Sequence, residues 1–92
     1  MKQSKEHPYE LGKNYLIRTV TMITTGKVVA VTGQEIVLTD AAWIADTGRF
    51  ADALRTGSFA EVEPFLDGEV IVGRAAVIDA CQVQFSLPRI QK

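Results

Sequence analysis

The sequence predicts a mainly β protein: a small, strongly bent, five-stranded antiparallel barrel with one short α-helix at about residues 46–56. Three observations support this fold class. Runs rich in β-branched residues recur along the chain, short turn signals separate them, and a single segment has the apolar spacing of a helix. The 92 residues suffice for one domain, which we assign to residues 11–92, after a flexible N-terminal arm at residues 1–10.

The first three predicted strands follow one another with short connections. The first occupies residues 15–23, and the Thr-Thr-Gly run at residues 24–26 signals a turn or a bulge. The second strand covers residues 27–31 and the third residues 35–39. Between them, Gly33 is expected to supply the positive φ of a tight hairpin turn. Such a series makes an antiparallel meander.

A short amphipathic helix is predicted after the third strand. Phe50 begins an apolar stripe with the i, i+3, i+4 spacing of a helix face. Asp46 or Thr47 is expected to cap the first turn, and Gly57 is a typical stop signal. A helix of about two turns is marginal in isolation, so we expect it to dock against the barrel.

The second half of the chain contains a predicted connection and two predicted strands. Residues 58–68 are expected to be irregular, and residues 69–80 to form a long strand with a bulge or bend at Gly73. Residues 81–87 alternate strictly between apolar and polar positions and predict the last strand, with Cys81 on its inward face.

The composition favours a protein that associates with itself. Hydrophobic residues make up 47% of the chain, which is more than a single small barrel can bury. A compact β-rich monomer is the alternative. The net charge is −1 and the two signs are interspersed, so the basic stripe of a general nucleic-acid binder is missing from the sequence.

The sequence lacks the residues that several kinds of functional site require. One cysteine and one histidine cannot build a cysteine-based metal cage, and neither a phosphate-binding glycine loop nor a catalytic triad pattern occurs. We therefore expect no enzyme activity, no metal and no cofactor. Apolar runs stay below the roughly 18 residues of a membrane span. The polar start is unlike a secretory signal. The expected location is the cytoplasm of a bacterial host or a virion.

Two segments carry a resemblance to known proteins. GKVVAVTGQEIVLTDA, residues 26–41, resembles the first signature of Sm-like small β-barrel proteins: a glycine in a strongly bent strand, a turn, and an apolar strand ending in an acidic residue and alanine. Residues 68–80 are similar to the second signature, with its glycine and arginine in reverse order as Gly73-Arg74. LTDAAWIADTGRF also resembles small proteins of tailed phages and prophages.

These resemblances imply two functions from different classes. The first is a self-assembling structural or scaffolding protein of phage origin. Its expected partners are its own copies, with a closed ring as one form of the assembly, and other phage proteins. The alternative is an Sm-like ring that binds RNA or a small nucleotide at subunit junctions. Thr32-Gly33-Gln34-Glu35 replaces the asparagine-containing turn with which the family contacts RNA, and this replacement favours the first function.

Three residues are candidates for ligand binding. Arg18 interrupts an apolar strand face and Arg74 follows a bend-forming glycine, so either guanidinium could bind a phosphate or form a structural ion pair. Trp43, the single tryptophan, could stack on a base or anchor the core.

Four residues are candidates for structural anchors: Trp43, Asp40, Asp46 and Phe50. Trp43 and Phe50 are expected to pin the helix across one mouth of the barrel. Asp40 and Asp46 are expected to act as a strand-end turn residue and a helix cap. A carboxylate pair for metal or acid–base chemistry is the alternative, although no further carboxylate or histidine is placed to complete it.

Overall fold

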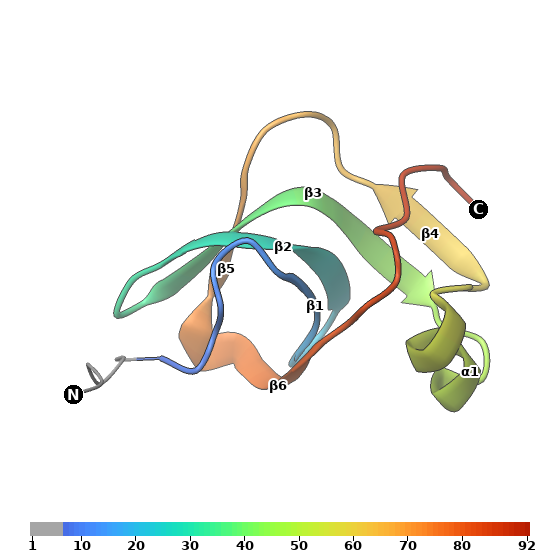
Figure 1. The fold of residues 1–92 in the computed structure, drawn as a ribbon, viewed down its shortest axis with the longest axis horizontal. Helices are drawn as coiled ribbons and strands as arrows, with labels where there is room; N and C mark the ends of the chain where they lie inside the picture. The colour runs from blue at the N-terminus through green and yellow to red at the C-terminus, as the bar shows by residue number, and fades with distance from the viewer. Residues whose placement is uncertain (1–6) are drawn as a thin grey trace.

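The computed structural model describes residues 7–92 and confirms a mainly β, antiparallel fold (Figure 1). Over this range it contains six strands, a short α-helix and a 3-10 turn. The elements are β1 (Asn14–Thr19), β2 (Ile23–Val31), β3 (Glu35–Asp46), α1 (Phe50–Thr56), β4 (Glu61–Pro64), β5 (Val70–Gly73), η1 (Arg74–Ala76) and β6 (Val77–Gln82).

The strands form one bent sheet in the order β4-β3-β2-β1-β6. The long strand β3 pairs with β4 along its second half and with β5 along its first half. Within the described residues β5 and β6 do not pair with each other, so the sheet stays open where the sequence predicts a closed five-stranded barrel. The chain turns through η1 between these two strands, and each keeps one edge without a strand partner.

The sheet bends at bulges in β2 and β3 (Figure 1). The register between these strands shifts after Thr25 and again after Val28. Gly26 lies inside the first shift, where a Cβ would come within 3.0 Å of Leu38 Cβ. The expected turn or bulge at residues 24–26 is thus a bulge, while the turn that ends β1 lies earlier, at residues 20–22.

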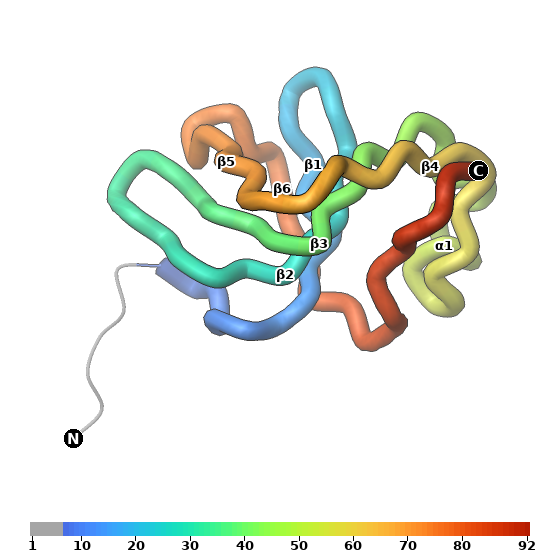
Figure 2. Tube along the Cα trace, turned by 90° about the horizontal axis from the view of Figure 1, so that it is seen from above, coloured from blue at the N-terminus to red at the C-terminus, as the bar shows by residue number. Residues whose placement is uncertain are grey.

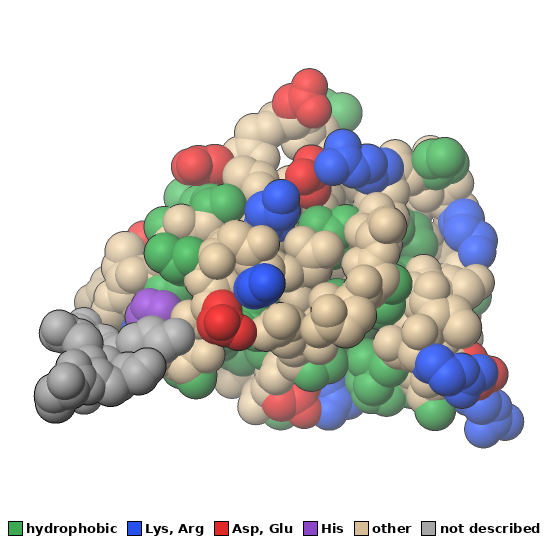
Figure 3. Space-filling view, viewed as in Figure 1, with side chains coloured by type: hydrophobic (Ala, Val, Ile, Leu, Met, Phe, Trp, Pro, Cys, Tyr) green, Lys and Arg blue, Asp and Glu red, His purple; other side chains and the backbone are tan. Residues whose placement is uncertain are grey.

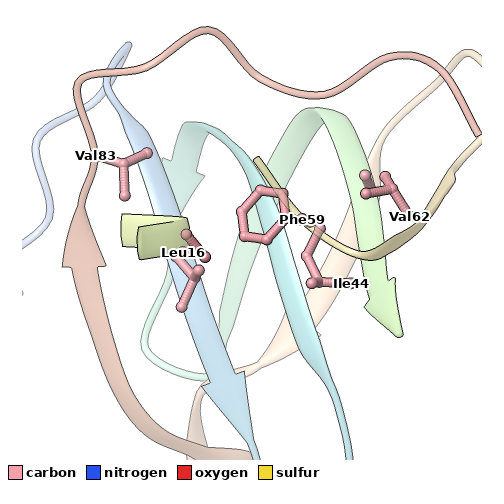
Figure 4. Close-up of a cluster of buried hydrophobic side chains, with 7 residues drawn as sticks. Leu16, Ile44, Phe59, Val62 and Val83 are labelled. Carbon is pink, nitrogen blue, oxygen red and sulfur yellow. The ribbon is translucent and has the colours of Figure 1, made fainter. Parts of the chain in front are cut away.

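Both faces of the bent sheet bury apolar side chains. We call the group between the sheet, α1 and the C-terminal segment cluster 1, and Figure 4 shows Phe59 within it between Leu16 and Ile44. Cluster 2 packs on the opposite face of the sheet. Cluster 1 comprises Leu16, Ala42, Ile44, Ala53, Phe59, Val62 and Val83; cluster 2 comprises Tyr15, Ile17, Val28, Ile36, Leu38 and Ala41.

The predicted helix is confirmed, but its cap is not. Phe50–Thr56 lies inside the expected range and ends at Gly57, whose φ of 75° matches the left-handed stop. Arg49 occupies the N-cap position without a side-chain hydrogen bond. Because β3 continues to Asp46, this carboxylate instead accepts a hydrogen bond of 2.8 Å from the Gly48 N–H in the turn before the helix.

Two other local predictions were wrong. Gly33 does not have a positive φ; the hairpin turn is held by Thr32, whose Oγ1 accepts hydrogen bonds from the backbone N–H groups of Gln34 and Glu35. Residues 58–68 are not irregular throughout, because β4 forms there. The expected break at Gly73 is confirmed, since η1 begins at the next residue.

The predicted last strand at residues 81–87 is mostly absent, because β6 ends at Gln82. We call residues 83–92 the strap; they run across cluster 1 to the edge of β4 (Figure 2). The apolar alternation serves burial rather than strand pairing: Val83 is buried, and Phe85 packs edge-on against Phe59 with ring centroids 5.8 Å apart.

The N-terminal segment is described from His7 onward. Tyr9 lies edge-on to Tyr15 with ring centroids 5.4 Å apart, and the Glu10 N–H donates to the Tyr15 hydroxyl. Residues 7–10 therefore contact cluster 2, while residues 1–6 of the predicted flexible arm lie outside the described residues. No helix in the described part of the chain is both long enough and apolar enough to span a membrane.

Candidate interaction surface

Two of the three predicted ligand-binding residues line the same pocket. Arg18 near the end of β1 and Trp43 on β3 border a cavity of about 440 Å³, together with Met22 from the β1–β2 turn and Ile78 from β6. We call it the Trp43 pocket. These residues meet because β1, β2, β3 and β6 are neighbouring strands, and Trp43 pairs in register with Thr24 near the start of β2.

Arg18 is held by a carboxylate from the adjacent strand. It pairs in register with Asp79 on β6 and donates Nε to Oδ1 at 2.7 Å and Nη2 to Oδ2. These hydrogen bonds lower the pKa of the Asp79 carboxyl and raise the pKa of Arg18. The guanidinium also lies 5.2 Å from the centre of the Phe50 ring. Its charge is therefore compensated within the chain.

Arg74 lies apart from the Trp43 pocket. Its Nη1 donates to the Thr32 carbonyl at 2.6 Å, and its backbone N–H donates to the Gln34 carbonyl at 2.8 Å. These two bonds tie η1 to the β2–β3 turn. Arg74 therefore has a structural role at this turn, and it does not lie with Arg18 and Trp43, the other two predicted ligand-binding residues.

Phe59, and not Trp43 or Phe50, is the aromatic residue that is buried in the same cluster as Ala53 of the helix. Trp43 is 40% exposed and Phe50 is 37% exposed, whereas Phe59 is only 2% exposed. The reason is strand geometry: Ala42 and Ile44 point into cluster 1, so Trp43 between them faces away from it. Phe59 carried no periodic signal, because it lies in the segment predicted as an irregular connection.

The two candidate aspartates make separate local contacts. Asp40 does not end its strand, because β3 continues to Asp46. Asp40 has a φ of 52°, a left-handed conformation that aspartate tolerates better than most residues, and its Oδ2 forms an ion pair with Arg89 Nη2 at 3.0 Å. Asp46 holds the turn before α1. Within residues 7–92, no group of three His, Cys, Asp or Glu side chains is arranged to hold a metal ion.

Cys81 lies in the partly buried rim of cluster 1. Burial raises the pKa of its thiol, and the negative charge of Asp79 raises it further. A thiol with a raised pKa is a poor nucleophile at neutral pH. This placement agrees with the expectation that Cys81 is a small packing residue.

Large apolar side chains surround the Trp43 pocket. Of the residues that line it, Ile78 is 65% exposed and Met22 is 39% exposed. Exposed tryptophan and methionine next to an arginine are typical of protein–protein contact surfaces. On the face drawn in Figure 3, charged side chains of both signs are mixed.

Comparison with family models, curated proteins and solved structures finds no match to this chain.

Proposed function

We propose that this protein is a non-enzymatic, self-assembling module whose copies associate through the Trp43 pocket and the adjoining edge of β6. The observation that carries the proposal is the position of Ile78. This side chain is 65% exposed, belongs to a strand with a free edge, and lines the same pocket as Trp43. The free edge and the Trp43 pocket, which is lined partly by apolar side chains, thus form one surface.

The two free strand edges support association between copies. Among residues 7–92, β6 has β1 as its strand partner and β5 has β3, which leaves an outer edge on each. Unpaired edges readily add a strand from another chain. Pairing of β5 from one copy with β6 from the next would continue the sheet between copies, and repetition would generate a closed ring or a lattice.

The charge distribution at the pocket favours a protein partner over a polyanion. The Arg18–Asp79 pair neutralises itself, so the pocket combines apolar side chains with polar groups whose charge is compensated. Nucleic-acid surfaces instead depend on uncompensated Lys and Arg. A second copy, which carries the same apolar surface, is the partner that this composition fits.

The biological setting that we propose is a phage or prophage particle, in which such a module acts as a structural or scaffolding component. This part rests on the resemblance of LTDAAWIADTGRF to small phage proteins, and the Sm-like resemblance of residues 26–41 supports a ring. Its partners would then include other phage proteins, in the host cytoplasm or in the virion.

Light scattering at micromolar concentration tests the assembly. We expect a mass that is a multiple of the 10.1 kDa chain, and we expect Ile78→Lys to lower this mass, because the substitution places a charge in the contact at the Trp43 pocket. Leu66→Lys is the matched control, because Leu66 is 92% exposed in the loop before β5 and should leave the assembly intact. A single-chain mass for the unaltered protein would remove the proposal.

The alternative is an Sm-like ring that binds RNA or a small nucleotide at subunit junctions. It is supported by one observation, the meeting of Arg18 and the half-exposed Trp43 indole at one pocket. Aromatic side chains bind bases by stacking. Co-purifying nucleotide, seen by ultraviolet absorbance and mass spectrometry, or oligonucleotide binding at low salt that Trp43→Ala abolishes, would favour this alternative over self-assembly alone.

A further inference from the structure

The strap covers the outer edge of β4. The Lys92 N–H donates to the Val62 carbonyl at 3.0 Å, and the Val62 N–H donates to the Lys92 carbonyl at 3.1 Å. The side chain of Gln91 adds a 3.3 Å hydrogen bond from Nε2 to Glu63 Oε2. Figure 2 shows this segment beside β4. Residues 91–92 therefore occupy the position of an added edge strand.

The middle of the strap is an arch with little support. Its first part is fixed by Val83 and Phe85 in cluster 1, and its last part by the Arg89–Asp40 ion pair and the β4 edge. Between them, no backbone N–H of residues 84–91 donates a hydrogen bond to any residue in the range 7–92. Ile90 is 78% exposed, and a cavity of about 530 Å³ is lined by residues of the strap itself.

We infer that the end of the strap exchanges between copies: residues 89–92 of one copy pair with β4 of a second copy, and the reverse. The occupant is a second copy because the same residues already fit this edge, through Lys92 at Val62, Gln91 at Glu63 and Arg89 at Asp40. Exchange preserves each of these contacts, so its cost is limited to association entropy and the change of backbone conformation at the hinge.

The arch supplies the hinge for this exchange. Residues 86–88 are Ser-Leu-Pro, and the proline holds Leu87 in extended backbone conformations. An extended hinge favours a strap that leads away from its own body. The exchange uses the β4 edge, whereas the proposed self-assembly uses the Trp43 pocket and the β6 edge. Either proposal can therefore be wrong while the other is right.

Shortening the hinge tests the inference. In an Ile78→Lys background, which removes the proposed β6 contact, deletion of residues 86–88 shortens the reach of the strap by up to about 10 Å. The strap then cannot return to its own β4 but can still reach a second copy. We expect a dimer of twice the chain mass by light scattering. Insertion of Gly-Ser-Gly after Ser86 in the same background is the control and should give a single chain. A single-chain mass for the folded deletion variant contradicts the exchange.

A second experiment tests the exchange without shortening the hinge, so it remains informative even if the deletion variant does not fold. One variant carries Glu63→Lys with Gln91→Lys, and the other carries Gln91→Glu, so each repels its own strap at this contact. In an exchanged pair of the two variants, both contacts join opposite charges. After co-refolding in the Ile78→Lys background, native mass spectrometry should show the mixed dimer as the dominant dimer. A mixture containing only single chains, or dimers in the statistical ratio, overturns the inference.

Discussion

Truncation of Phe59 should destabilise this protein far more than truncation of Trp43, although tryptophan is the larger residue. Phe59 is 2% exposed and contacts Phe85 edge-on, so Phe59→Ala leaves a cavity in cluster 1. Such a change in a core costs about 3–5 kcal/mol. Trp43 is 40% exposed, and the smaller apolar area lost in Trp43→Ala costs about 1–2 kcal/mol at the usual value per unit area.

The same magnitudes can be expressed as melting temperatures. For 92 residues the unfolding entropy near the midpoint is about 0.2 kcal/mol/K. Phe59→Ala should therefore lower the Tm by about 15–25 °C, and Trp43→Ala by about 5–10 °C. Thermal unfolding followed by circular dichroism measures both, at a concentration at which each variant has the same association state.

The order of the two melting temperatures shows which aromatic residue anchors the helix. A Trp43→Ala variant that melts as low as Phe59→Ala would refute the assignment of the helix anchor to Phe59. It would return Trp43 to the anchoring role that the sequence first suggested. Phe59→Leu serves as the control, since it keeps most of the buried volume and should lose less than the alanine variant.

Three further predictions concern backbone strain, pH and thiol reactivity. Gly57→Ala should lower the Tm more than Gly12→Ala: both glycines have a positive φ, but a Cβ at Gly57 would lie 2.5 Å from Phe85 Cγ, whereas nothing lies within 4 Å at Gly12. Equal losses would contradict the close approach of the strap. Because Arg18 lowers the pKa of Asp79, this carboxylate stabilises the fold above its ordinary pKa of about 3.9, and the stabilisation is lost as the pH falls through the lowered value. In urea unfolding, wild type and Asp79→Asn should therefore differ at pH 7, and the difference should shrink as the pH falls below about 3.9. A difference that does not change with pH would argue against the pair. Burial raises the pKa of Cys81, so the folded protein should react with iodoacetamide more slowly than the protein unfolded in urea, and equal rates would contradict its packing.

The candidate site was predictable in part. Arg18 and Trp43 stood out in the sequence as an arginine on an apolar strand face and a single tryptophan, and the sheet brings both to one pocket. Asp79 could not be found this way, because it lies 61 residues from Arg18 and meets it only through the pairing of β1 with β6. Arg74 was grouped with them on residue type alone, and its actual partner is the Thr32 carbonyl.

The sequence by itself determined the features that depend on local backbone preference. β-branched runs specify strands, Gly57 ends the helix in a left-handed conformation, and Gly26 and Gly73 mark the bulge and the break. Each of these signals acts over a few residues, so it can be recognised without knowledge of any distant partner.

The tertiary structure alone decided which segments pair and which aromatic side chain is buried. Glu61–Pro64 is only four residues long and ends in proline, so its sequence alone gives a weak strand signal. It becomes a strand because β3 is long enough to offer Ile44 as a partner for Val62. Phe59 is buried because the strap brings Phe85 against it. Hydrogen bonds and apolar contacts between residues far apart in the chain form only when the sheet has bent, and a local pattern contains no record of that geometry.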